Sequence, residues 1–422
     1  MNIKQSVYFF LRGCYFGADE LLYRFLTKFP ARTAVEDEKK RVVFVVDHPS
    51  PRVYKMMKQL HKNGWEIICF YRVKRGVDVE KEVRPYSVRV ERYISAYGAY
   101  NLCQQYPGAV FHVFCCYVYD VPELLIQKKV GKVIFDNYDG YAGFVVGWDE
   151  SKGNRKTTAQ EKFCMENADG MTCRSFESQY NKWRMGYRFK GKRLLFFDYC
   201  STEKKRYLRE HKLNDSPIFF YGGGLPDEEN FPNYIHSCFV EAARQISANG
   251  GQLWVYHGRL TKAKKNYYEK ASVEIPGFRL HDAVPFEEML KVMSGCDFSI
   301  MPTRGSFMDG FRQGGDGGNQ YYNYIKYIYA AANKFFDASE VGLPLVGCTP
   351  LKIFKMLERA GMAVYCPVEE LGDKIPYLKE HYDEYRANII KNIDRFSIEK
   401  NIHRLIAFYE EIAATRPIES DS

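Results

Sequence analysis

Three consecutive glycines stand directly after an apolar segment of the chain. Gly222, Gly223 and Gly224 follow residues 217–221, whose aromatic and aliphatic side chains predict a buried strand. Because glycine has no side chain, a backbone turn of this kind can approach a bound ligand closely. The three glycines therefore form a candidate ligand-binding turn, although a plain tight turn has the same composition.

Two arginines occupy the ends of later predicted strands. Arg259 follows the strand that contains Trp254, and Arg304 follows the strand that contains Ile300. Side chains at the carboxyl ends of parallel strands face the place where α/β proteins bind ligands, and guanidinium groups suit phosphate oxygens. We therefore predict that both arginines contact an anionic ligand. Exposure to solvent without a ligand is the alternative for each.

Asp136 and Asp139 stand at the end of another apolar segment, residues 133–136. A carboxylate in this place can act as a general base that removes a proton from a hydroxyl group. Asp47 and His48 occupy the equivalent place after the first predicted strand. The catalytic base therefore stays open among these four side chains.

The twelve cysteines are scattered along the chain, without a Cys-x-x-Cys pair or a Cys/His cluster at the spacing of zinc ligands. They are typical of buried thiols in a reducing cytoplasm. No acidic pair of the Asp-x-Asp kind flanks a predicted strand end. We therefore expect neither a tightly held metal nor another cofactor.

Short apolar strands alternate with helices along most of the chain. Residues 42–46 predict a buried parallel strand, the following helix ends at Gly64, and residues 65–71 predict the next strand. The alternation restarts near residue 214. These patterns predict an α/β protein with two Rossmann-like, doubly wound domains that face a cleft. The predicted parts are an amphipathic helical segment (1–40), an N-terminal Rossmann-like domain (41–213), a C-terminal Rossmann-like domain (214–376) and terminal helices with a tail (377–422).

Of the 422 residues, 46% are apolar and 27% are charged, which is typical of a globular protein with two or three domains. No window holds the roughly 18 uncharged apolar residues of a membrane span, and the N-terminus lacks the features of a secretory signal. We therefore expect a cytoplasmic protein. The helices predicted in residues 1–40 either pack on the protein body or lie on a membrane surface.

Positive charge is concentrated in one segment. The formal net charge is +9, and residues 181–212 hold eleven Lys or Arg residues against three acids. A solvated helix face would explain this segment, but an anionic substrate or the anionic inner leaflet of a membrane would also suit it. No recognisable DNA- or RNA-binding motif accompanies the charge, so we do not expect a nucleic acid partner.

Residues 333–345 resemble a motif of the GT-B glycosyltransferases, specifically the bacterial nucleotide-sugar enzymes whose C-terminal motif is close to N-K-aromatic-aromatic-acid-x-x-x-x-G-x-P-V. The matching residues are Asn333, Lys334, Phe335, Phe336, Asp337, Gly342, Leu343, Pro344 and Leu345. Three weaker matches stand in the family's order: residues 47–67 with Arg52, residues 164–179 with Ala168, Asp169 and Ser175, and residues 285–302. The resemblance covers roughly residues 41–395 and implies the GT-B fold.

The resemblance also implies a function, in which residues 41–213 form the acceptor domain and residues 214–376 the nucleotide-sugar donor domain. It suggests a hexosyltransferase that uses a nucleoside diphosphate sugar, with UDP or GDP as the nucleotide, and a saccharide or lipid-linked acceptor, as in surface polysaccharide synthesis. Asp337 stands where relatives have a Glu that binds the donor ribose, and Lys334 would neutralise phosphate or pair with Asp337. His112 stands where relatives often have a histidine near the transferred sugar; a core role is its alternative.

One position departs from the family. Retaining relatives often have a first Glu that seven residues separate from the ribose-binding acid, and Tyr329 stands there in this chain. The stereochemical outcome is therefore open. Residues 304–320 are rich in glycine and predict a loop that would exclude water from the cleft. Two further functions stay open: a nucleotide-sugar epimerase of the same fold, which needs no acceptor, and a catalytically silent scaffold.

Overall fold

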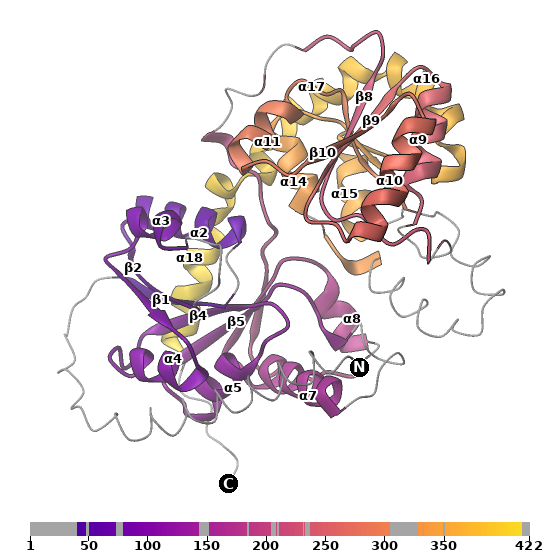
Figure 1. Cartoon of the computed structure of the whole chain (residues 1–422). Helices are drawn as coiled ribbons and strands as arrows, with labels where there is room; N and C mark the ends of the chain where they lie inside the picture. The colour runs from indigo at the N-terminus through magenta and orange to yellow at the C-terminus, as the bar shows by residue number, and fades with distance from the viewer. Residues whose placement is uncertain are drawn as a thin grey trace.

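The computed structural model describes residues 40–47, 50–72, 79–142, 152–183, 185–203, 208, 211–230, 232, 237–303, 328–331, 333–348 and 351–415. The helices predicted before Lys40, the glycine-rich loop of residues 304–320, His48 and Arg304 lie outside these residues. The described residues form two α/β lobes, one above the other in Figure 1.

The first lobe is a parallel sheet with apolar clusters on both of its faces. Phe44 packs into the cluster that also contains α2 and α18, whereas its neighbour Val45 packs into the cluster of α4 and α5. Both faces are therefore buried, which explains the continuous apolar run of the first strand. The strands are β1 (Arg41–Val46), β2 (Glu66–Arg72), β3 (Arg89–Tyr93), β4 (Val110–Cys115), β5 (Lys132–Asn137), β6 (Gly170–Cys173) and β7 (Lys192–Leu195), and the helices are α2 (Pro51–Lys62), α3 (Val79–Val83), α4 (Ala96–Cys103), α5 (Asp120–Gln127), α7 (Lys152–Asn167) and α8 (Glu177–Trp183).

The second lobe repeats this plan with a smaller parallel sheet. Its helix α10 begins at a side-chain cap, because the Thr261 hydroxyl accepts a hydrogen bond from the Lys264 N–H. The strands are β8 (Ile218–Gly222), β9 (Gln252–His257), β10 (Phe278–Asp282), β11 (Phe298–Met301), β12 (Leu345–Gly347) and β13 (Ala363–Tyr365), and the helices are α9 (Phe239–Ala248), α10 (Lys262–Glu274), α11 (Phe286–Met293), α14 (Asn333–Glu340), α15 (Lys352–Arg359), α16 (Leu371–Glu380), α17 (Tyr382–Asn392) and α18 (Ile398–Ala414).

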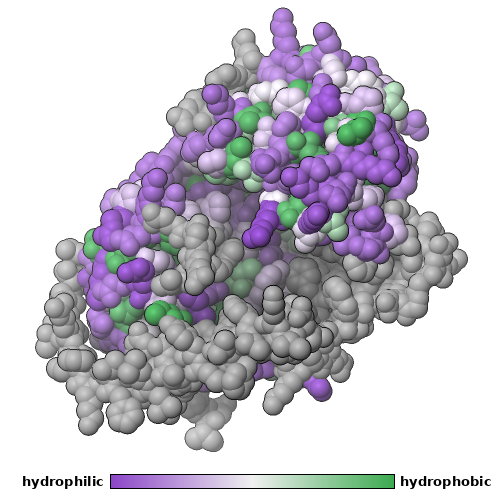
Figure 2. Space-filling view, in the orientation of Figure 1, coloured by the Kyte–Doolittle hydropathy of each residue, from purple (hydrophilic) through white to green (hydrophobic). Residues whose placement is uncertain are grey.

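The strand order of each sheet creates a place for a ligand. The first sheet runs β3-β2-β1-β4-β5-β6-β7 and the second runs β10-β9-β8-β11-β12-β13. In each sheet the chain first adds strands on one side of its first strand and then adds the remaining strands on the other side. Such a switch point leaves a crevice at the carboxyl ends of the strands. The predicted fold class, two doubly wound domains, is confirmed. Figure 2 shows a hollow between the two lobes with hydrophilic side chains around it.

The last helix crosses back to the first lobe. Helix α18 packs against α2, β4 and β7, and in Figure 1 it lies beside the strands of the first lobe. The Ser397 hydroxyl starts this helix by accepting a hydrogen bond from the Lys400 N–H. The sequence pattern predicted terminal helices here but not their return to the first lobe. In the part of the chain that the structure describes, no helix is both long and apolar enough to cross a membrane.

Candidate functional site

The glycine turn of the second lobe lies at the end of β8, the central strand beside the switch point. Gly223 has a φ of 154°, and its N–H donates to the Tyr256 carbonyl. A Cβ atom at Gly223 would lie only 2.7 Å from Cε of Lys334 and 2.8 Å from its Nζ. At this φ a residue other than glycine would be strained, and the end of the Lys334 side chain would have to move to make room for its Cβ. A Cβ at Gly224 would meet nothing within 4 Å, so the backbone of this turn is accessible there.

Lys334 joins the glycine turn to the start of helix α14. Its ammonium group lies 4.7 Å from the centroid of the Tyr221 ring, which holds it beside the end of β8. The two segments that were predicted separately to bind a donor, residues 222–224 and Lys334, are thus adjacent. An ammonium group beside an accessible glycine turn and a helix N-terminus can neutralise phosphate oxygens.

Asp337 follows one turn later in α14, and its side chain is 20% exposed. Lys55 of the first lobe reaches it with an Nζ–Oδ1 distance of 3.7 Å and also pairs with Glu340, at 3.2 Å. Burial raises the pKa of Asp337 to about 7; the charge of Lys55 lowers it, and that of Glu340 adds to the increase. Burial also disfavours the charged form of Lys55, which by itself would lower the pKa of this lysine. The negative charges of Glu340 and Asp337 have the larger combined effect, so the pKa of Lys55 is raised.

Arg259 lies two residues beyond β9, the neighbour of β8, and it is exposed. This position is compatible with contact to a ligand at the glycine turn. Its role stays a prediction, as does that of Arg304, which lies outside the described residues.

In the first lobe, His112 and Asp136 are fully buried. The His112 ring hydrogen-bonds with the Tyr409 hydroxyl of α18 at 2.6 Å and with Asp136 at 3.0 Å, and Arg52 donates to the same Asp136 oxygen at 3.0 Å. Burial opposes ionisation of Asp136, but the charge of Arg52 and the hydrogen bond from His112 lower its pKa. Neither side chain reaches the surface of the described residues. The structural alternative therefore fits His112 and Asp136 better than a catalytic role.

Arg52 extends this buried cluster to the linker between the lobes. One of its terminal nitrogens donates to the carbonyl groups of Phe196 and Phe197, and it lies 3.2 Å from a carboxylate oxygen of Asp198. The cluster therefore ties β5, α2 and the linker together. Asp47, the other acid considered as a base, is also buried and pairs with Arg72 at 2.8 Å.

Asp139 is more accessible than Asp47 and Asp136, with a side chain that is 22% exposed. It lies two residues beyond β5 and accepts hydrogen bonds from Arg174 at 2.8 Å and from the Tyr117 hydroxyl at 3.2 Å. Of the acids considered from the sequence, Asp139 therefore has the position that a general base requires. Its catalytic role stays a prediction.

Arg174 connects Asp139 to the second lobe. Besides Asp139, its guanidinium group binds Asp198 at 3.0 Å and the Asn333 side chain at 2.8 Å, and it lies 4.0 Å from the centroid of the Tyr138 ring. Asn333, the first residue of α14, also donates to the Tyr138 hydroxyl. A hydrogen-bonded chain thus crosses the cleft from Asp139 through Arg174 to the residue before Lys334.

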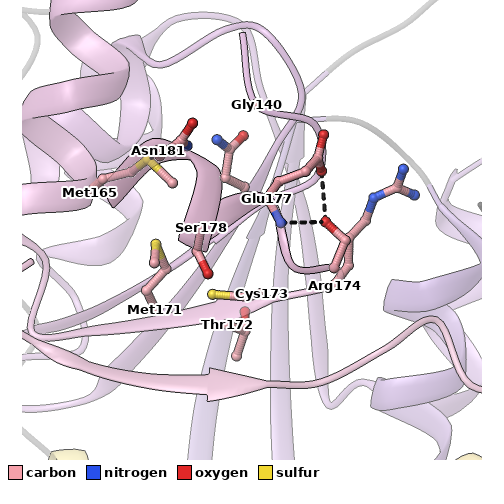
Figure 3. Close-up of a pocket in the computed structure, with 11 residues that line it drawn as sticks. Gly140, Met165, Met171, Thr172, Cys173, Arg174, Glu177, Ser178 and Asn181 are labelled. Carbon is pink, nitrogen blue, oxygen red and sulfur yellow. Dashed lines mark hydrogen bonds between the residues drawn. The ribbon is translucent and has the colours of Figure 1, made fainter. Parts of the chain in front are cut away.

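A small cavity of about 20 Å³ lies at the carboxyl ends of β5 and β6. Figure 3 shows Arg174 at its rim, extending away from Met165 and Met171. This volume suits about one water molecule and no sugar. The candidate site is therefore the cleft itself. Within the described residues, no group of three or more His, Cys, Asp or Glu side chains is arranged to hold a metal.

Tyr329, which stands in place of the first family Glu, packs between the lobes. Its carbonyl accepts a hydrogen bond from the Phe176 N–H at 2.9 Å, and its ring lies 3.9 Å from Nζ of Lys352 and 6.2 Å from the Trp183 ring. The aromatic side chain therefore serves as a contact between the lobes in this structure.

Sequence reasoning missed Arg174 and Lys55. Arg174 follows directly after strand β6, so the criterion that selected Arg259 would have selected it as well. No local pattern distinguishes Lys55 from the other lysines of α2, because its acidic partners belong to the other lobe.

No family model matches the chain, and no curated protein matches it. Solved structures do resemble it. Sucrose-phosphate synthase from Thermosynechococcus elongatus superposes with a TM-score of 0.62 at 14% identity and covers 89% of this chain and 100% of its own. The catalytic domain of starch synthase IV from Arabidopsis thaliana, bound to ADP and acarbose, has a TM-score of 0.57 at 9% identity, with 90% and 100% covered.

A putative UDP-N-acetylglucosamine 2-epimerase from Listeria monocytogenes is also similar, with a TM-score of 0.51 at 10% identity, covering 90% of this chain and 99% of its own. These likenesses show the fold, which is that of the GT-B glycosyltransferases. The same architecture thus occurs in a protein described as a putative epimerase.

Proposed function

We propose that the protein is a glycosyltransferase that moves a hexose from a nucleoside diphosphate sugar, with UDP or GDP as the nucleotide, to a saccharide or lipid-linked acceptor. The observation that carries this proposal is the hydrogen-bonded chain across the cleft. It brings Asp139 of the first lobe into one continuous network with Asn333, whose neighbour Lys334 covers the glycine turn. An accessible acid and a phosphate-binding turn on opposite sides of a cleft are what sugar transfer requires.

In this proposal the diphosphate lies beside residues 222–224 and Lys334, and Asp337 accepts hydrogen bonds from the ribose hydroxyls. Asp139 removes the proton from the acceptor hydroxyl, whose oxygen forms a bond to the anomeric carbon as the bond to the diphosphate breaks. The leaving nucleotide gains negative charge, which Lys334 and the backbone amides of the turn stabilise. Arg259 and Arg304 would add positive charge, and no metal is needed.

We also propose that the protein works in the cytoplasm in polysaccharide biosynthesis, as a peripheral protein on the inner face of the membrane. The basic segment supports this part of the proposal, because each exposed cation near an anionic lipid surface contributes about 1 kcal/mol of attraction.

Nucleotide-sugar consumption by the purified full chain tests the function. A panel of UDP- and GDP-sugars is incubated with and without saccharide acceptors, and the nucleotides and sugars are separated by chromatography. A transferase releases nucleoside diphosphate when an acceptor is present. A change of the donor sugar into its epimer without acceptor would instead support the epimerase, and no turnover under either condition would support a scaffold.

A further inference from the structure

A groove of about 550 Å³ lies between helix α8 and the edge strand β7 of the first lobe. Its walls include Gln179, Lys182 and Trp183 from α8 and Lys192 and Arg193 from β7. This volume is within the range of roughly 300–1,000 Å³ that is typical of small-molecule sites. The groove is distinct from the glycine turn, which belongs to the second lobe.

The charged side chains that line the groove are all positive. Among the described residues that form its walls, Lys182, Lys192 and Arg193 are exposed, and no Asp or Glu is included. Lys192 pairs with the exposed Glu411, whereas the guanidinium group of Arg193 lies 4.7 Å from the Phe189 ring. Part of the charge excess of residues 181–212 is therefore gathered around one concave surface, which would attract an anion.

Trp183 adds an aromatic surface to this charge. Trp183 is 63% exposed, although an indole is among the largest apolar side chains. Nζ of Lys352 from the second lobe lies 5.1 Å from its ring. Sugar rings carry faces of C–H groups that pack against an indole, while their carboxylate, sulfate or phosphate groups pair with cations. An exposed tryptophan between cations therefore suits an anionic saccharide.

The groove reaches the end of β6, the strand that Arg174 follows. Cys173, Ser175 and Ser178 line both the groove and the small cavity of Figure 3, and Arg174 lines that cavity. Arg174 in turn binds Asp139 at 2.8 Å. A saccharide chain in the groove would thus lie beside the strand end whose next residue, Arg174, binds Asp139.

We propose that this groove binds a negatively charged acceptor saccharide. The inference rests on the proposed function, since it identifies the class of acceptor and where its chain is held. A concave surface with one aromatic wall suits a single chain better than the flat surface of a bilayer.

Calorimetry without any donor tests the groove. The probes are a hexasaccharide of galacturonic acid, a sulfated heparin hexasaccharide, and the neutral methyl ester of the first. We expect at least one charged hexasaccharide to bind the full chain at low salt and to bind more weakly as salt is added. The neutral ester should bind at least about tenfold more weakly. Bound saccharide should also protect Trp183 from acrylamide quenching, a signal absent in Trp183→Phe.

Substitutions distinguish binding in the groove from a general effect of the protein's net charge. Lys182→Glu with Arg193→Glu should weaken binding at least about tenfold, and Trp183→Ala about three- to tenfold. Lys265→Glu with Lys270→Glu on α10 changes the net charge equally and should have no effect. All variants should bind UDP or GDP as the wild type does.

Three results would overturn the inference: no binding of either charged hexasaccharide, equal binding of the charged and neutral probes, or groove variants with unchanged affinity. Binding to phosphatidylglycerol vesicles without binding to saccharides would point to a membrane instead. If the chain binds nucleotide but no saccharide, the groove inference fails and the proposed function stands. If it binds saccharide but no nucleotide, the proposed function fails.

Discussion

The ammonium group of Lys55 lies 3.7 Å from a carboxylate oxygen of Asp337, although the two residues belong to different lobes. Lys55 is closer to Glu340, at 3.2 Å, which is 1% exposed. The single ammonium group of Lys55 therefore lies near two carboxyl groups. The more exposed of the two, Asp337, has a pKa that is raised to about 7. The fold thus disfavours the carboxylate form of Asp337, and acids with perturbed pKa values are common at functional sites.

We predict that Asp337→Asn weakens the binding of UDP or GDP about tenfold to a hundredfold, because a hydrogen bond to a charged acceptor contributes roughly 1.5–3 kcal/mol. Calorimetry of nucleotide binding to wild type and variant measures the effect. Asp373→Asn removes an exposed acid elsewhere in the second lobe and should leave the affinity unchanged. Equal affinities for wild type and Asp337→Asn would remove Asp337 from the site.

The same substitution should stabilise the free protein at neutral pH. The folded-state pKa of Asp337, about 7, lies above the ordinary value of 3.8, so the unfolded chain loses this proton at lower pH than the folded one. Ionisation therefore costs stability increasingly between about pH 4 and pH 7, and the cost is constant above pH 7. Asp337→Asn should melt at a higher temperature than wild type at pH 8, with a difference that shrinks toward pH 4. Melting curves without ligand at several pH values decide this, and a lower melting temperature of the variant at pH 8 would contradict it.

Asp139→Asn should reduce turnover roughly 10²- to 10⁴-fold, the usual contribution of a general base. The asparagine oxygen can still accept the hydrogen bond from Arg174, so nucleotide binding should stay within about twofold of wild type. Steady-state kinetics and nucleotide calorimetry measure the two quantities. Asp282→Asn, at the exposed end of β10, is the matched control. Full activity of Asp139→Asn would exclude this residue as the base.

Arg52→Met should destabilise the first lobe by about 3–5 kcal/mol, because it leaves the buried carboxylate of Asp136 without its cation. Denaturant unfolding monitors the loss, and the exposed Arg244→Met provides the control. Combining Arg52→Met with Asp136→Asn should cost less than the sum of the two single changes. Strictly additive costs would show that the pair is not coupled.

EDTA should leave turnover unchanged if Lys334, the helix N-terminus and the backbone of the glycine turn supply the positive charge that the leaving nucleotide requires. The assay is the nucleotide-release measurement, with and without the chelator. Complete loss of activity in EDTA, restored by magnesium or manganese, would contradict this prediction.

Local patterns in the sequence were sufficient for the fold class and for one half of the candidate site. Consecutive apolar residues such as Val42–Val46 are explained by burial on both faces of a parallel sheet, and this requirement is visible in the chain itself. The glycine turn could also be identified locally, since a turn after a strand has recognisable residues, whereas Lys334 was identified through the resemblance of residues 333–345 to a family motif. Their proximity, with Cε of Lys334 2.7 Å from where a Cβ of Gly223 would stand, belongs to the tertiary structure.

Tertiary structure alone decided which charged side chains are accessible. Asp136 and Asp139 are three positions apart and equivalent by pattern, yet Asp136 is buried against Arg52 and His112 while Asp139 faces the cleft. The return of α18 covers His112 with Tyr409, and the approach of the lobes brings Lys55 to Asp337. These contacts join residues far apart in the chain. The free energy of these contacts depends on how whole helices and strands pack against one another and on how much water the packing excludes. A local sequence pattern therefore cannot predict the contacts.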